Sequence, residues 1–219
     1  YNALGFPVTD VAEVAIEAPK FPKGVSVYNA EGKQVASQLL SYRNGTVYLL
    51  IEATVPATGY AVYDVRLSGS QKLADSFVSE TTVENSVYKI SLDKKNNKEL
   101  VKDGKSIRLA LFTENESYNW PAWEILKKTI DRAPVSITED VKMNLCENGA
   151  LRKTLCIEKR HGKSLFRQYI RLYEGELADR IDFYNEINWQ STNALLKAEF
   201  PLNVDNEKAT YDLGIGSVQ

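Results

Sequence analysis

The chain has 219 residues, 43% of them hydrophobic, which is enough to bury a sizeable core in one large or two smaller domains and excludes a disordered chain. Its 27 basic and 29 acidic residues leave a formal charge of −2, so neither nucleic acid nor a membrane surface is an expected partner. The longest apolar runs, such as 47–51, are far shorter than the roughly 20 residues that span a bilayer.

The first 70 residues predict short strands separated by tight turns. Period-2 patterns of apolar and polar residues cover 11–17, 25–28, 47–53 and 61–67. Glycine, proline and asparagine typical of turns lie between them, at 19–24, 30–32, 43–45 and 56–59. Many short strands at close spacing favour a small β-sandwich over 1–70.

A polar segment of small residues follows and predicts a linker at 71–80, before a second domain over 81–219. A new strand is expected over 84–92. The lysine-rich stretch 94–105 is expected to be a solvated loop, because its charges are mixed in sign.

Helical signal is confined to 124–130, which is bounded by Pro121 and Pro134 and is long enough for one or two turns. Further along, bulky and polar side chains nearly alternate over 166–173 and 180–189, as in half-buried strands. The expected fold class is therefore all-β.

The two cysteines are expected to be buried free thiols. A turn centred on Asn148 and Gly149 would make the flanking segments a hairpin. In that register Cys146 faces Leu151, and Cys156 lies several residues further along the ladder. A disulfide needs Cα atoms within about 7 Å, which this pairing does not provide.

Hydrolysis of a glycoside needs two carboxyl groups that act together, and the sequence spacing does not show which carboxylates could form such a pair. Carboxylates such as Asp179 and Asp182 are expected to be solvated, because unpaired acidic side chains are seldom buried. The single histidine, His161, is expected to be exposed in a hairpin loop. A zinc site or a Ser-His-Asp relay is therefore not expected in this chain.

An aromatic segment stands out as a candidate binding site. The seven-residue segment 118–124 contains Tyr118, Trp120, Trp123 and Glu124. Aromatic rings can stack on the apolar face of a sugar while polar groups bind its hydroxyls. Packing of these rings in the core is the alternative, since aromatic side chains more often fill cores.

Basic residues near the C-terminal strands raise the possibility of an anion site, at Arg160, Lys163, Arg167 and Arg171. Arg167 and Arg171 share one face of a strand with Tyr169, however. A solvated outer face is therefore favoured over an anion site.

Segments along the C-terminal half are similar to one known family, at 162–173, 180–183, 188–189, 195–201 and 209–211. Further similar segments follow the same order upstream, at 1–6, 31–38, 56–60, 83–88 and 148–152. Taken together, they resemble the C-terminal β region of the glycoside hydrolase family 38 α-mannosidases.

The resemblance implies a small immunoglobulin-like β-sandwich over 1–70 and part of a galactose-mutarotase-like supersandwich over 81–219, truncated at its C-terminal end. Family members are retaining α-mannosidases whose N-terminal catalytic domain holds the nucleophile, the acid/base and a zinc ion. No segment of this chain resembles that domain. Catalytic residues, metal ligands and cofactors are therefore expected in the parent enzyme and not in this chain.

The chain is thus expected to be a non-catalytic β-scaffold, cut from a longer protein, that packs on the missing N-terminal catalytic domain. The full-length enzyme would act on terminal α-mannosides. The segment 120–125 resembles a family segment in which Trp-Asp-Ala-Trp-Asp-Ile is common, with Pro121 and Glu124 differing. The resemblance implies that Tyr118, Trp120, Trp123 and Glu124 lie at the rim of the substrate cleft.

Two other functions are weighed against this one. A free-standing module that binds mannose or mannan would use the aromatic segment as a stacking platform. An epimerase related to galactose mutarotase is less favoured, because such enzymes rely on histidine and carboxylate pairs. Absence of the remaining sandwich strands would also leave an edge strand through which two copies could pair.

Overall fold

The computed structural model describes residues 1–68, 82–93, 98–101, 105–113, 117, 119–120, 123–201 and 204–219. The fold is all-β, as the sequence predicted: the strands pair antiparallel in every sheet, and helix among the described residues is limited to two short segments. The expected linker at 71–80 lies outside the described residues.

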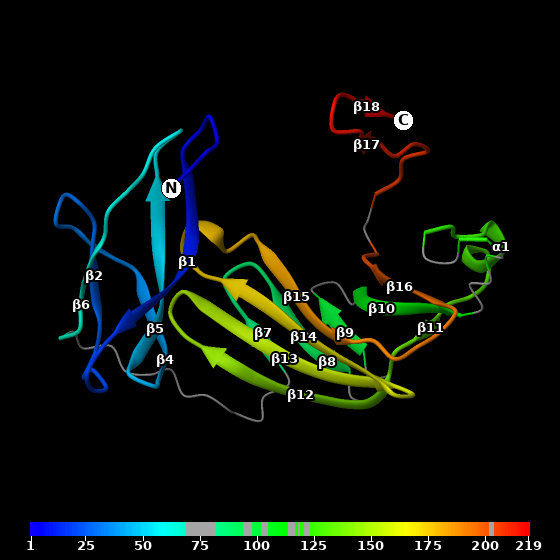
Figure 1. The fold of residues 1–219 in the computed structure, drawn as a ribbon, viewed down its shortest axis with the longest axis horizontal. Coiled ribbons are helices and arrows are strands. Elements are labelled where there is room, and N and C mark those ends of the chain that lie inside the picture. The colour runs from blue at the N-terminus through cyan, green and yellow to red at the C-terminus, as the bar shows by residue number, and fades with distance from the viewer. Residues whose placement is uncertain are drawn as a thin grey trace.

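The N-terminal strands form two antiparallel sheets of three strands, with orders β1-β5-β4 and β3-β2-β6 (Figure 1). Their bounds are β1 (Val8–Glu17), β2 (Ser26–Tyr28), β3 (Gln34–Val35), β4 (Ser37–Arg43), β5 (Thr46–Val55) and β6 (Asp64–Arg66). Strands are thus confirmed within 11–17, 25–28 and 47–53. The strand predicted at 61–67 is longer than β6, which it contains, and β4 was not predicted.

The two sheets enclose one core, which explains why these residues form strands. Val47, Leu49 and Ile51 alternate along β5 and are buried against side chains of the other sheet, including Val27. A two-residue turn joins β4 to β5, and its residues Asn44 and Gly45 have φ of 50° and 77°. Asn-Gly suits such a turn because both residues tolerate positive φ.

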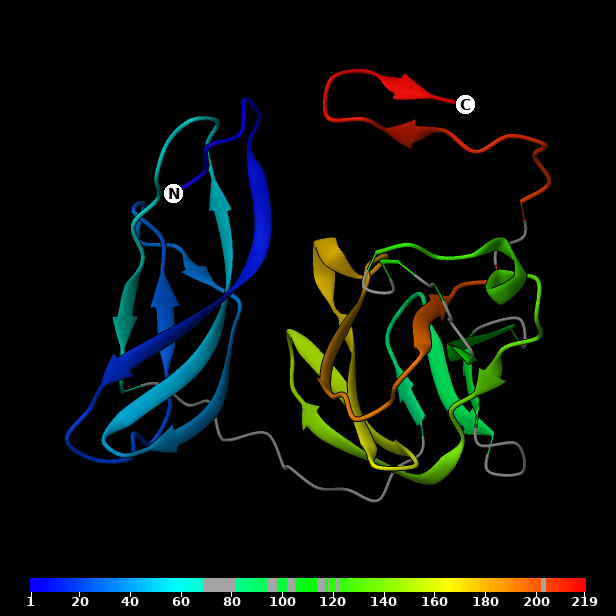
Figure 2. The same ribbon diagram turned by 45° about the vertical axis from the view of Figure 1, so that its right-hand side comes forward.

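The remaining strands form two larger sheets and a small hairpin (Figure 2). The first sheet has order β11-β10-β9-β8-β7, with β16 also paired to β10. Its bounds are β7 (Thr82–Glu84), β8 (Lys89–Asp93), β9 (Lys98–Val101), β10 (Lys105–Thr113), β11 (Val135–Ser136) and β16 (Ala194–Glu199).

The second sheet is a meander of four strands in the order β12-β13-β14-β15. Its bounds are β12 (Glu139–Asn148), β13 (Arg152–His161), β14 (Ser164–Tyr173) and β15 (Ile181–Asn188). The strands expected at 166–173 and 180–189 are therefore confirmed. The expected helical segment is confirmed as α1 (Lys127–Ile130), and a 3₁₀ turn, η1 (Gly175–Leu177), precedes β15.

One face of the meander is apolar and packs against the neighbouring sheet. Leu155, Ile170 and Leu172 are buried there with Val83 and Ile90 of β7 and β8. A second cluster joins Phe166 of β14 to Leu109 and Leu111 of β10 and to Ile137. The opposite face of the meander is left for polar side chains.

Two expectations between 84 and 105 are wrong. The predicted strand 84–92 is interrupted after β7, because Asn85 closes a turn: its Oδ1 accepts from the backbone N–H of Val87 at 2.9 Å and of Tyr88 at 2.6 Å. Such side-chain bonding to the backbone competes with strand pairing. Within the predicted loop 94–105, residues 98–101 form β9, which pairs with both β8 and β10, while 94–97 and 102–104 lie outside the described residues.

The expectation of two free thiols is also wrong, because Cys146 and Cys156 form a disulfide. Cys156 pairs with Asn144, and a β-bulge between Leu145 and Glu147 inserts an extra residue into β12. The two cysteine Cα atoms are consequently 5.9 Å apart, within the range for a disulfide. A symmetric hairpin pattern could not reveal this bulge.

The C-terminal hairpin of β17 (Tyr211–Asp212) and β18 (Ser217–Val218) stands apart from the larger sheets in both views (Figures 1 and 2). Tyr211, Leu213 and Ile215 are all exposed there. As for membranes, the helices that the structure describes are all too short and too polar to cross one.

Candidate functional site

Trp120, Trp123 and Glu124 are joined in a turn before α1. Backbone N–H groups of Trp123 and Glu124 both donate to the Trp120 carbonyl, at 3.3 and 2.8 Å. Trp120 and Trp123 are 51% and 73% exposed, so neither residue fills the core. Tyr118 lies outside the described residues. The structure thus presents two of the predicted residues on the surface.

Glu124 is the fourth predicted residue, and its carboxylate is engaged within the turn. Ser117, which is buried, donates its hydroxyl hydrogen bond to Oε2 of Glu124. The same hydroxyl oxygen accepts from the backbone N–H of Trp120 at 3.4 Å. The carboxylate therefore helps to order the turn that holds the two indoles.

His161 differs from its expected exposed loop position. It is the last residue of β13, pairs with Ser164 and has a side chain that is only 28% exposed. Its Nδ1 lies 3.4 Å from Oε1 of Glu139. Within the ranges that the structure describes, the His, Cys, Asp and Glu side chains form no group of three or more that could hold a metal ion.

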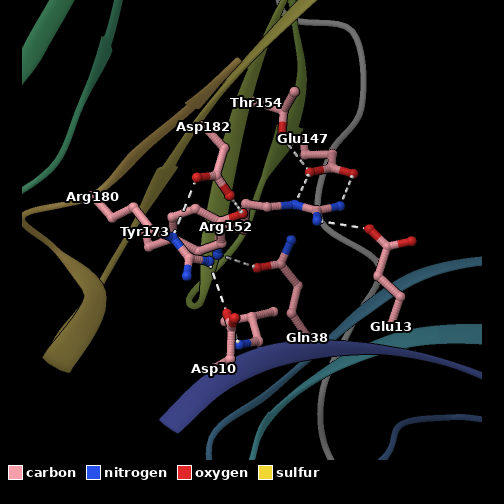
Figure 3. A network of polar contacts seen from close by, with 10 residues as sticks. Asp10, Glu13, Gln38, Glu147, Arg152, Thr154, Tyr173, Arg180 and Asp182 are labelled. Carbon is pink, nitrogen blue, oxygen red and sulfur yellow. Dashed lines mark hydrogen bonds and ion pairs between the residues drawn. The ribbon is translucent and has the colours of Figure 1, made fainter. Parts of the chain in front are cut away.

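A polar network that the sequence did not reveal joins the N-terminal sandwich to the meander (Figure 3). Arg152 is at its centre, with a side chain that is 3% exposed. Its Nε and Nη2 donate to the carboxylate of Glu147 at 2.7 and 2.8 Å, and its Nη1 donates to Oε1 of Glu13 on β1 at 2.7 Å. Thr154 also donates to Glu147. A buried guanidinium is thus held between carboxylates of two sheets.

Electrostatics explain why these groups stay ionised despite their burial. Burial by itself raises the pKa of Glu147, but hydrogen bonds from Arg152 and Thr154 and the attraction of nearby guanidinium groups outweigh it and hold the pKa below 4.5. Burial likewise lowers the pKa of Arg152, but the carboxylates of Glu147 and Glu13 outweigh it and raise that pKa.

Gln38 of β4 provides a second link across the same boundary. Its Oε1 accepts from the backbone N–H of Leu151 at 3.0 Å and of Arg152 at 2.8 Å, in the turn between β12 and β13. Gly149 lies against this amide, so closely that a Cβ there would be 2.0 Å from Cδ of Gln38. A glycine at this position therefore allows the turn to dock on β4.

Arg180 forms the third link and explains a wrong expectation. Its Nη2 donates to Oδ1 of Asp10 on β1 at 2.8 Å, and this hydrogen bond outweighs burial and lowers the pKa of Asp10. Its Nε pairs with Asp182 at 3.3 Å, and Tyr173 donates to Asp182 at 2.6 Å. Asp182 was expected to be solvated and unpaired, but it is part of the network.

The rest of the polar face of the meander is open to solvent. Asn144, Cys156, Tyr169 and Tyr184 are paired directly across the four strands and so project from the same face. The adjacent row on the same face carries Lys142, Glu158, Arg167 and Glu186. These two rows are called the aromatic row and the charged row below.

Two of the four basic residues, Arg167 and Arg171, have partners on this face. Nε of Arg167 lies 3.1 Å from Oε2 of Glu158, and the guanidinium of Arg171 lies 5.2 Å from the ring centroid of Tyr184. Arg160 and Arg167 are exposed. The solvated outer face favoured by the sequence therefore describes Arg167 better than an anion site does.

Residues 78–219 match the family described as the glycosyl hydrolases family 38 C-terminal domain. Over an alignment of 252 residues the chain is 24% identical to alpha-mannosidase G of Dictyostelium discoideum, covering 100% of this chain and 21% of that protein. Over 217 residues it is 23% identical to human alpha-mannosidase 2C1, and the alignment covers 90% of this chain and 21% of that protein.

Mouse alpha-mannosidase 2C1 is also 23% identical, over 235 residues that cover 98% of this chain and 22% of that protein. The chain therefore spans about a fifth of the length of these curated relatives. The family match covers more than half of the chain and includes both larger sheets described above. The chain accordingly belongs to glycosyl hydrolases family 38, whose C-terminal domain it contains.

Proposed function

We propose that this chain is the non-catalytic β-scaffold of a retaining α-mannosidase, which hydrolyses terminal α-mannosides in its full-length form. The observation that carries the proposal is the match of 78–219 to the C-terminal domain of the family, in relatives that are named α-mannosidases and are about five times as long. The catalytic groups and the zinc ion would then belong to a separate N-terminal domain.

In this proposal the chain packs on the catalytic domain and contributes to the rim of its substrate cleft. Exposure of Trp120 and Trp123 supports such a role, because an indole can stack on the apolar face of a sugar ring. The bonded turn around Ser117 and Glu124 would hold both rings in place before substrate binds.

Hydrolysis of an aryl α-mannoside tests the scaffold function. The full-length protein should release the aryl group, whereas the 219-residue chain alone should release none. Release of the aryl group by the 219-residue chain alone would overturn the proposal.

The rim is tested in the full-length enzyme with Trp123→Ala. Loss of a contact made equally in the ground and transition states should raise KM about tenfold and leave kcat nearly unchanged. Tyr60→Ala is the matched control, because Tyr60 is 66% exposed, close to the 73% of Trp123, and lies in the N-terminal region. An unchanged KM in Trp123→Ala would remove this residue from the rim.

A free-standing mannan-binding module is the second candidate, and the surface position of both indoles favours it. In that case the isolated chain binds mannan, and both Trp120→Ala and Trp123→Ala abolish binding without changing the unfolding temperature. The scaffold proposal expects these indoles to act only beside the catalytic domain.

A further inference from the structure

The open face of the meander contains a hollow of about 220 Å³ over strands β12, β13 and β14. Its lining includes Asn144, the Cys146–Cys156 disulfide, Glu158, Arg167 and Tyr169. It lies on the opposite side of the sheet from the buried core, within the aromatic and charged rows. We call it the sheet-face hollow.

Part of the lining of the sheet-face hollow is apolar. The disulfide contributes two sulfur atoms, and Tyr169 contributes a half-buried ring. Tyr184 continues this surface beyond the hollow: the two ring centroids are 5.7 Å apart, with the planes inclined by 46°. Since Tyr184 is 49% exposed, a ligand longer than the hollow would meet a second aromatic ring.

Polar side chains complete the lining of the hollow. The side-chain amide of Asn144 has no hydrogen-bond partner within the part of the chain that the structure describes, so it can both donate and accept. Glu158 and Arg167, in the charged row, pair at 3.1 Å and retain further acceptor and donor positions. Apolar rings bordered by both donors and acceptors match the two faces of a pyranose.

The charges decide against an anionic ligand. Along the charged row, Lys142, Glu158, Arg167 and Glu186 alternate in sign, and Glu158 lies within 4.0 Å of Lys142 and 3.1 Å of Arg167. Paired charges of both signs produce little net field, so they would not attract a polyanion. A neutral ligand rich in hydroxyl groups fits this surface better.

We infer that the sheet-face hollow and Tyr184 form a binding site for a neutral oligosaccharide, with one sugar ring over the disulfide beside Tyr169 and the next over Tyr184. This site is separate from the turn that holds Trp120 and Trp123. The inference does not depend on the proposed hydrolysis, because it concerns binding by the chain itself.

The test is titration of the 219-residue chain with α-mannotriose and, separately, with maltotriose. Calorimetry measures the affinity, and backbone amide NMR shifts locate the site. At least one trisaccharide should bind with a Kd on the order of 1 mM. Shifts should concentrate on β12, β13, β14 and β15. Absence of binding by both sugars overturns the inference.

Variants locate the site. Tyr184→Ala should weaken binding about tenfold through loss of ring contact. Tyr184→Phe keeps the ring and should bind like the wild type, and Asn144→Ala should weaken binding severalfold. Trp123→Ala and the exposed-tyrosine control Tyr60→Ala should bind normally, with equal unfolding temperatures throughout.

Loss of binding in Trp123→Ala with normal binding in Tyr184→Ala would overturn the inference and assign the sugar to the turn before α1. Shifts confined to other strands would also overturn it. Because binding and hydrolysis are measured separately, failure here leaves the scaffold function to be judged by its own assay.

Discussion

Gln38 and Arg152 are 114 positions apart, yet the side-chain oxygen of Gln38 accepts the backbone N–H of Arg152 at 2.8 Å. The same oxygen accepts from Leu151, so one amide of the N-terminal sandwich holds the turn between β12 and β13. Arg152 then extends its own side chain back to Glu13 of β1. The two regions are therefore joined by reciprocal contacts.

Gln38→Leu should lower the free energy of unfolding by about 2 kcal/mol, because it leaves two buried backbone N–H groups without an acceptor. Urea denaturation measures the change. Gln34→Leu is the matched control at an exposed position of β3 and should stay within about 0.5 kcal/mol of the wild type. Equal losses in both variants would mean that the amide does not hold the turn.

Arg152→Met should cost about 3–5 kcal/mol, because the carboxylate of Glu147 is then left partly buried without its partner. Glu13→Gln should cost less than about 1 kcal/mol, since the Glu13 side chain is 56% exposed and solvent screens its pair with Arg152. Chemical denaturation of both variants separates the two contacts. A larger loss in Glu13→Gln would reverse this ranking.

Acid should destabilise the protein through Glu147. Its pKa in the folded state lies below the ordinary 4.5, so its contribution is present above pH 4.5 and is lost as the pH falls through the lower folded-state value. Glu147→Gln removes this contribution, and its unfolding free energy should decline less steeply below pH 4.5. The exposed Glu31→Gln is the control and should keep the wild-type slope.

Thiol titration under denaturing conditions should detect no free thiol before reduction and two after it, as the Cys146–Cys156 disulfide requires. The double variant Cys146→Ser/Cys156→Ser should lose about 2–3 kcal/mol of stability, because a short loop is no longer closed in the unfolded chain. Reductant should leave the stability of this variant unchanged. Two thiols before reduction would restore the free-thiol interpretation.

Asn85→Ala should lower the unfolding free energy by about 2–4 kcal/mol, because one amide joins three segments. Its Nδ2 donates to the carbonyls of Tyr173 at 2.6 Å and Ala178 at 2.9 Å, while its Oδ1 closes the turn after β7. Asn85→Asp keeps the acceptor and loses both donors, so thermal unfolding should place it between wild type and Asn85→Ala. Identical melting of Asn85→Ala and the wild type would contradict this role.

Alternation of apolar and polar residues along the sequence predicted the strands that have one buried face and one exposed face. Along β5 and β14, apolar side chains alternate with others because one face is buried, and the alternation is visible without coordinates. The same reasoning failed at Asn85 and at Cys146, where one side-chain hydrogen bond or one bulge changes the pairing. Neither event alters the composition of the segment in which it occurs.

The order of residues along the chain was sufficient to establish an all-β protein, its resemblance to family 38 and an aromatic segment with two tryptophans. Alternation and turn residues act over a few positions, so they can be recognised locally. Only the tertiary structure decided that Arg152 meets Glu13, that Arg180 meets Asp10, and that Asn144, Cys156 and Tyr184 lie in one row on the same face of the meander. Those contacts depend on sheet register and on how the sheets dock, and long-range packing determines both.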